Sequence, residues 1–137
     1  HGRTSQPVYA AGSIALAALE RLLYLRLDPA SGMFPEQHLF RIEIPDGVPV
    51  EAADVAALPR SWTRMAAPLD VLAPATALQK LGDAWWEART SVAWVVPSAL
   101  VPEEPNVLLH PLHPDYPALS IEYARTFRYD PRLAAKR

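Results

Sequence analysis

A single acidic residue, Glu20, interrupts an apolar stretch of this 137-residue chain. Its neighbours Leu19, Leu22 and Leu23 predict an apolar setting. Removing an ionised carboxylate from water costs on the order of several kcal/mol unless the group is paired, protonated or used in a reaction. Glu20 is therefore the first candidate catalytic residue. Two simpler explanations remain open: Glu20 shares a narrow solvent-exposed strip with Arg21, or it pairs with an arginine of the core.

Ser98 is the second candidate, because it follows directly on an apolar run of strand-forming residues, 92–96, and Pro97. Side chains at the end of a strand often meet a ligand, although a serine after a proline is also ordinary in turns. The surrounding residues do not form a Gly-x-Ser-x-Gly motif, and no histidine stands in a recognisable partner motif. The sequence therefore argues against a serine hydrolase.

Residues at the start of the chain are the candidates for binding a nucleotide. No glycine-rich phosphate-binding motif occurs in the sequence. Phosphate contacts would then come from Arg3 and His1, and aromatic stacking from Tyr9. The alternatives are core packing for Tyr9 and a frayed terminus for Arg3.

Metal binding is not expected. The sequence contains no cysteine, and the spacing of His110 and His113 matches no known zinc motif. We expect these two histidines to support the structure of a proline-rich loop.

The spacing of apolar residues predicts the elements that must position Glu20. Residues 8–11 form a short apolar strand, Ser13 is suited to cap a helix, and residues 14–25 are expected to form that helix. The helix is apolar nearly all round, which is typical of a helix packed on several sides.

The rest of the chain predicts a mixture of strands and helices. We expect a half-exposed strand at 39–44, with Phe40, Ile42 and Ile44 facing the core. Residues 45–74 are expected to be irregular, with a turn at 58–62, and a helix capped by Thr76 is expected at 77–87. We then expect a buried central strand at 92–96, a strand at 106–110, a turn at 113–116 and a last strand near 126–129. This mixture predicts an α+β fold.

Composition restricts the function classes. Half of the residues are apolar and the net charge is -2, so neither disorder nor non-specific nucleic-acid binding is expected. No apolar run reaches the roughly 18 residues of a membrane span, and the lack of cysteine is compatible with a reducing compartment. We therefore expect one domain in the cytoplasm, with residues missing upstream of His1.

Several stretches, in this order, resemble the RES-domain family, toxins of bacterial toxin–antitoxin pairs named for an arginine, a glutamate and a serine. The resembling stretches are 7–13, 17–20, 81–85, 96–109 and 127–133. The Val-Pro-Ser segment that ends at Ser98, followed by Asn-Val-Leu-Leu at 106–109, is the most specific part. The resemblance implies a single mixed domain similar to ADP-ribosyltransferase toxins, with central twisted sheets, flanking helices and a cleft for NAD.

The resemblance also implies roles for individual residues. Glu20 would be the family's glutamate and Ser98 its serine, both catalytic, and Tyr9 would stack on NAD or hydrogen-bond to it. His1 falls where the family's Gly-Arg-Trp-Asn-like motif has its asparagine. The arginine would then lie just upstream, so residues 1–137 would be a RES domain lacking its N-terminal segment. Arg3 is too close to Tyr9 to be that arginine, but it would still approach phosphates. His110 departs from the family, which more often has asparagine there.

The activity implied by the resemblance is cleavage of the nicotinamide–ribose bond of NAD, with water, phosphate or a protein side chain as acceptor. The implied partner is a cognate antitoxin with an Xre-like helix-turn-helix domain. That antitoxin would cover the NAD cleft and contact nucleic acid in place of this chain, in a complex able to hold more than one toxin copy. The alternative is a non-enzymatic interaction domain of the same fold that only binds a partner.

Overall fold

The computed structural model describes residues 6–58 and 77–134. The strands in this part of the chain are β1 (Val8–Ala11), β2 (Gln37–Glu43), β3 (Val50–Ala52), β4 (Ala93–Pro97), β5 (Pro105–Leu109) and β6 (Ser120–Phe127). The α-helices are α1 (Ile14–Leu22) and α2 (Ala77–Ala88), and the short 3-10 helices are η1 (Val55–Ala57), η2 (Tyr116–Ala118) and η3 (Pro131–Ala134). The predicted α+β class is confirmed.

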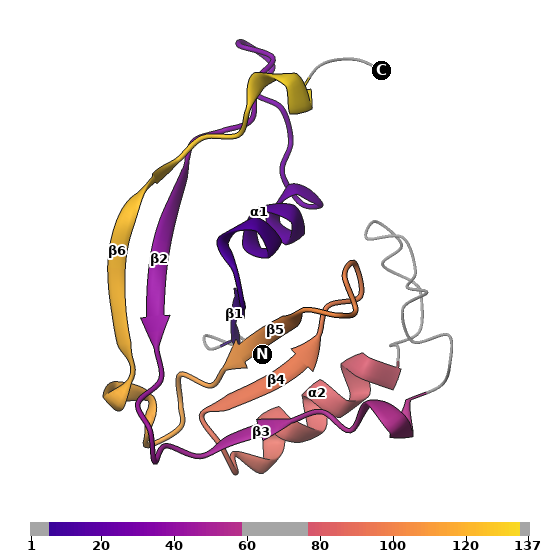
Figure 1. Ribbon diagram of the computed structural model, residues 1–137, viewed down its shortest axis with the longest axis vertical. Helices are drawn as coiled ribbons and strands as arrows, with labels where there is room; N and C mark the ends of the chain where they lie inside the picture. The colour runs from indigo at the N-terminus through magenta and orange to yellow at the C-terminus, as the bar shows by residue number, and fades with distance from the viewer. Residues whose placement is uncertain (1–5, 59–76, 135–137) are drawn as a thin grey trace, which may run out of the picture.

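The strands form two separate sheets. Four of them are ordered β1-β5-β4-β3, whereas β2 pairs only with β6 among the described strands. β5 pairs antiparallel with both β1 and β4, and β3 runs parallel to β4. Figure 1 shows β2 and β6 as a long curved ribbon, with α1 beside it and above β5. Because α1 follows β1 almost directly, it begins where β1 leaves the four-stranded sheet.

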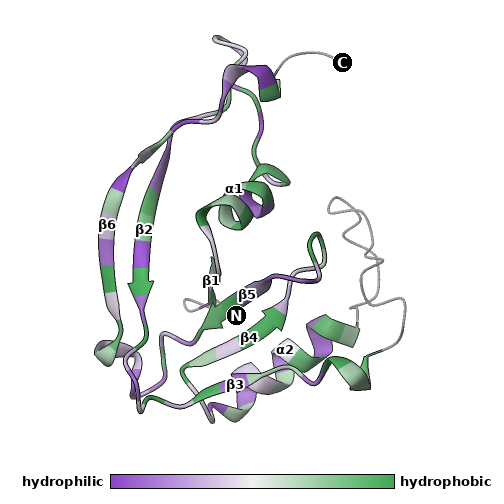
Figure 2. Cartoon of the chain, in the orientation of Figure 1, coloured by the Kyte–Doolittle hydropathy of each residue, from purple (hydrophilic) through white to green (hydrophobic). Residues whose placement is uncertain are grey.

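The four-stranded sheet carries a core on each of its faces, because successive side chains of a strand point to opposite sides. On one face, Trp94 and Leu108 pack with Trp85 of α2. On the other face, Leu109 packs in a second cluster, and Ile42 of β2 lies against it. Figure 2 shows the apolar colouring of β4 and β5 that results from burial on both faces. By the same alternation, Tyr9 of β1 and Asn106 of β5 lie on the face that packs against α2.

Most of the predicted elements that flank the candidate residues are confirmed. The strand at 8–11 and the Ser13 cap are present as expected, and the helix at 77–87 and the strands at 92–96 and 106–110 agree to within one residue at each end. β4 is also an interior strand of its sheet, as its continuous apolar run predicted.

Helix α1 is shorter and more exposed than predicted. It ends at Leu22 instead of residue 25, and Leu16 is its buried residue. Ile14 and Leu19 are 51% and 43% exposed. The expectation of a helix packed on several sides is therefore wrong for this chain alone, because α1 lies at the end of the sheet and the described residues cover only part of its surface.

One predicted core residue of β2 is also exposed. Ile42 and Ile44 pack against the core as expected, but Phe40 is 53% exposed. Phe40 lines an open cavity, and its ring packs on that of Tyr123 of β6 with the ring centroids 5.5 Å apart. The reason is that β2 belongs to the separate β2–β6 sheet and pairs with no described strand of the four-stranded sheet.

Two strands fall outside their predicted ranges. β3 lies in the segment predicted to be irregular, and β6 begins at Ser120, well before the expected position near 126. Both are placed by pairing with distant strands, which local patterns do not record. The cap predicted at Thr76 and most of the turn predicted at 58–62 lie outside the described residues. None of the helices within 6–58 and 77–134 is long and apolar enough to cross a membrane.

Candidate functional site

Glu20 is positioned by the attachment of α1 to β5. The Oγ of Ser13 accepts a hydrogen bond from the Leu16 N–H at 3.1 Å and so caps the helix. The N–H of Gly12 donates to the carbonyl oxygen of Pro105 at 3.0 Å. A Cβ atom at residue 12 would lie 2.8 Å from Pro105 Cγ, so this close approach requires glycine. The helix that carries Glu20 is therefore held beside the start of β5.

Ser98 contacts Glu20 directly. Its Oγ donates a hydrogen bond to Glu20 Oε2 at 2.6 Å, and the Ser98 residue is completely buried. The same Oγ accepts hydrogen bonds from the N–H groups of Leu100 and Val101, each at 3.1 Å. Because the hydroxyl carries one proton and its acceptor positions face two N–H groups, that proton is directed at Glu20. Ser98 thus orients the carboxylate.

Asn106 makes the third contact of this cluster. It begins the Asn-Val-Leu-Leu stretch of the family resemblance, but it was not predicted to be a site residue. Its Nδ2 donates to Glu20 Oε2 at 2.7 Å. Asn106 lies in β5 opposite Ala11 of β1 and Val96 of β4. A polar residue within an otherwise apolar interior strand was the available signal, because a buried amide requires hydrogen-bond partners.

The two simpler explanations of Glu20 do not match the structure. Arg21 donates from its Nε to Gln37 Oε1 at 3.2 Å, and Glu20 forms no ion pair with any described residue. Glu20 is half-buried and is held by two uncharged donors on the same oxygen. Within 6–58 and 77–134, no side chain hydrogen-bonds to the other oxygen, Oε1.

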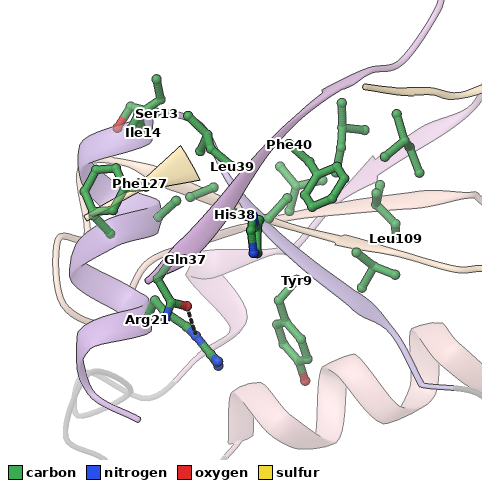
Figure 3. Close-up of a pocket in the computed structure, with 18 of the residues that line it drawn as sticks. Tyr9, Ser13, Ile14, Arg21, Gln37, His38, Leu39, Phe40, Leu109 and Phe127 are labelled. Atoms are coloured by element: carbon green, nitrogen blue, oxygen red, sulfur yellow. Dashed lines mark hydrogen bonds between the residues drawn. The ribbon is translucent and has the colours of Figure 1, made fainter. Parts of the chain in front are cut away.

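Tyr9 lies on the same face of the sheet as Asn106. It pairs with Leu108, which packs on the α2 side, and Asn106 is the next residue of β5 on that side. Tyr9 is 74% exposed, which excludes the core-packing alternative, and its hydroxyl points toward α2 in Figure 3. Desolvation, with smaller contributions from Tyr24 and Asp83, raises the pKa of the Tyr9 phenol, so it remains a neutral hydrogen-bond donor at neutral pH. Arg3 and His1 lie outside the described residues.

The likeness to known proteins covers almost the whole chain. Residues 1–131 match the sequence model of the RES domain. The chain belongs to the RES domain family. One relative, named "Prs ADP-ribosylating toxin", from Sphingobium sp. (strain YBL2), is 35% identical over 94% of this chain and 75% of its own length. Two relatives named "Toxin Res" come from Photorhabdus laumondii, with 36% identity over 80% of this chain and 63% of the relative, and from Yersinia enterocolitica, with 35% identity over 92% and 76%.

The RES domain also contains a cavity of about 630 Å³. Its walls come from α1, β1, β5 and the β2–β6 sheet, and they are mostly apolar (Figure 3). Val8, Ala10 and Leu109 line it from the sheet face that points away from α2. Tyr9 and Ala11 also line the cavity, so it borders β1, while Glu20, Ser98 and Asn106 lie outside its lining.

The two histidines of this RES domain support local structure, as predicted. His110 is buried, its ring stacks on Trp86 with centroids 3.8 Å apart, and its Nε2 donates to the Trp86 carbonyl oxygen at 2.9 Å. Its Nδ1 accepts from the N–H of Leu112 at 3.3 Å. His113 Nδ1 accepts from the N–H of Asp115 at 3.0 Å. Both rings thus hold the loop that follows β5.

Proposed function

We propose that this RES domain is a toxin that cleaves the nicotinamide–ribose bond of NAD, with Glu20 as the catalytic carboxylate. The observation that carries the proposal is the pair of hydrogen bonds that Ser98 and Asn106 donate to Glu20 Oε2. Oε1 accepts no side-chain hydrogen bond from the described residues, and Asn106 lies on the sheet face where Tyr9 is exposed. Relatives named as toxins, one of them as ADP-ribosylating, support the choice of reaction.

Glu20 suits a reaction in which positive charge develops on the substrate. When the bond between ribose C1′ and the nicotinamide nitrogen breaks, the electron pair leaves with nicotinamide and C1′ becomes oxocarbenium-like. A carboxylate beside the ribose stabilises that charge and accepts a hydrogen bond from a ribose hydroxyl, as acidic residues do in glycoside hydrolysis. The acceptor then attacks C1′ and releases a proton. Water, phosphate and a protein side chain all fit this scheme.

Tyr9 is the residue best placed to contact the nucleotide beside Glu20. It lies diagonally across β1 and β5 from Asn106, at a residue separation of roughly 7–8 Å that a tyrosine ring can span. Its exposed ring offers a face for stacking, and its neutral hydroxyl can donate to the ligand. Arg3 and His1 are proposed as additional phosphate contacts.

The proposal includes a protein partner. Leu19, Leu23 and Tyr24, on α1 and just after it, expose 43–65% of their surfaces. Exposed apolar residues on one short segment are typical of a surface that a partner covers. We infer that a helix-turn-helix antitoxin covers the Glu20 side and carries any contact with nucleic acid, in the cytoplasm.

The decisive experiment compares Glu20→Gln with Glu43→Gln. Glu43 is an exposed glutamate of β2 that pairs with Arg41 at 2.8 Å, so its substitution is a matched control. Incubation with NAD should release nicotinamide from the unaltered chain and from Glu43→Gln. Glu20→Gln should lose roughly 10²-fold or more of the rate, because the carboxylate charge acts on the transition state. Its expression should also no longer arrest growth.

Two results would contradict the proposal. A Glu20→Gln chain that still depletes NAD and arrests growth would remove Glu20 from the reaction. An unaltered chain that releases no nicotinamide would favour the non-enzymatic interaction domain.

A further inference from the structure

The Glu20 carboxylate is held at one oxygen only. Ser98 Oγ and Asn106 Nδ2 both donate to Oε2, at 2.6 and 2.7 Å. A carboxylate can turn about its side-chain bonds and exchange its two oxygens. Two short hydrogen bonds to the same oxygen from different elements oppose that rotation. Oε1 therefore has a defined position.

Both donors are themselves fixed. Ser98 is fully buried, and the N–H groups of Leu100 and Val101 set the direction of its hydroxyl proton. Asn106 lies in β5, which has a neighbouring strand on each side. The bond from the Gly12 N–H to the Pro105 carbonyl oxygen ties the residue before Asn106 to the start of α1. The donors thus hold Glu20 from two elements of the same sheet.

We propose that Asn106 is a positioning residue, which together with Ser98 holds Glu20 Oε2 and so presents Oε1 to the ribose of the substrate. This inference rests on the proposed function, because it assigns the working oxygen of the same carboxylate. Asn106 need not touch the substrate itself. Its contribution is to prevent Glu20 from turning away when positive charge develops on the ribose.

The kinetic test uses Asn106→Asp, which keeps the size of the side chain but replaces the donor with an acceptor. Its kcat for nicotinamide release should fall on the order of 10²-fold, with little change in KM, because a misplaced catalytic group lowers the rate without removing substrate contacts. Two carboxyl groups at hydrogen-bond distance do not both ionise readily, so the acid limb of activity against pH should move upward by about one unit or more.

Ser13→Ala is the matched control for the kinetic test. It removes the cap of the same helix without touching the carboxylate of Glu20. It should lower thermal stability while leaving the pH profile in place. An acid limb that moves equally in Ser13→Ala and Asn106→Asp would show that Asn106 acts only through the stability of α1, and would overturn the proposal.

A second measurement needs neither activity nor an altered Asn106. Asn106 is the only asparagine in the sequence, so selective ¹⁵N labelling gives a single asparagine side-chain amide in an NMR spectrum. In the unaltered chain, one Nδ2 proton should resonate downfield, as expected for a bond to a carboxylate. Glu20→Ala should move this resonance toward the position of a solvent-exposed amide. Identical positions in the two proteins would overturn the proposal.

The two measurements separate the possible failures. A chain that releases no nicotinamide overturns the proposed function, and the NMR comparison then still decides whether Asn106 holds the carboxylate. Full kcat in Asn106→Asp, in a chain whose Glu20→Gln variant is inactive, overturns the positioning role alone.

Discussion

Ser98 and Asn106 are uncharged, and both donate to the same oxygen of Glu20. An arginine partner would orient a carboxylate as firmly, but it would also offset the negative charge that the proposed oxocarbenium-like state needs. Neutral donors orient Glu20 and leave its charge in place. This distinction separates Glu20 from Glu43, whose exposed carboxylate is paired with Arg41.

Ser98→Ala should reduce both stability and activity. The substitution removes the donor to Glu20 and leaves the N–H groups of Leu100 and Val101 without their acceptor. Unsatisfied partly buried donors cost about 1–3 kcal/mol, so the midpoint of urea unfolding should fall accordingly. Ser120→Ala, in which a hydroxyl that bonds to the exposed Glu122 is lost, should change the midpoint little. An unchanged midpoint in Ser98→Ala would contradict the assigned hydrogen bonds.

At the scale of elements, the site depends on how closely α1 approaches β5. Gly12 contacts Pro105, and both residues adjoin elements that carry site residues. Burial of apolar side chains contributes little to fixing this helix, because Leu16 is the single buried residue among Ile14–Leu22. The contact of Gly12 with Pro105 therefore sets the position of α1, and with it that of Glu20.

Gly12→Ala should move α1 away from β5. The new Cβ would lie 2.8 Å from Pro105 Cγ, so one of the two segments must shift, at a cost of about 1–3 kcal/mol. Thermal unfolding and nicotinamide release should both decline. Pro105→Ala removes the ring atoms that cause the clash. In a Pro105→Ala background, Gly12→Ala should therefore cost much less stability and activity than it does in the unaltered chain. If the losses of Gly12→Ala and Pro105→Ala simply add in the double variant, the contact between residues 12 and 105 is not the cause of the Gly12→Ala loss.

At the scale of the whole molecule, Tyr129 connects the β2–β6 sheet to the helix that carries Glu20. It follows β6, its hydroxyl donates to the carbonyl oxygen of Ala18 at 2.6 Å, and its ring contacts Phe127 and Phe34. Burial raises the pKa of Tyr129, and the opposing effect of Arg21 is smaller. The bond to Ala18 requires the protonated phenol.

Stability should therefore decline in alkali through Tyr129. A phenol whose pKa is raised by folding contributes stability below the pKa of the unfolded chain, about 10, and this contribution is lost as the pH rises through the folded-state pKa. Tyr129→Phe should lower the free energy of unfolding at pH 7 by about 1 kcal/mol and flatten the decline above pH ~10. Urea unfolding from pH 7 to 11 tests this, with Tyr123→Phe on β6 as control. An equally steep decline in Tyr129→Phe would assign the loss to other groups.

Local patterns predicted much of the frame of the site. β1, the Ser13 cap, α2, β4 and β5 follow from apolar runs and capping residues that act within a few positions of the chain. β3 and the true start of β6 were missed, because their hydrogen bonds go to strands far away in sequence. Phe40 was wrongly predicted to be a core residue for a related reason. Alternation predicts the side of the strand on which its side chain lies, but not whether another element packs against that side.

The sequence alone marked Glu20 as an acid in an apolar helix and Ser98 as a polar residue at a strand end, and it placed both in one family pattern. Hydropathy and spacing are enough for that, because they are properties of neighbouring residues. Only the tertiary structure showed that Ser98 and Asn106 converge on one oxygen of Glu20, from residues 78 and 86 positions away. Convergence depends on sheet pairing and on the approach of Gly12 to Pro105, and neither is recorded in local sequence.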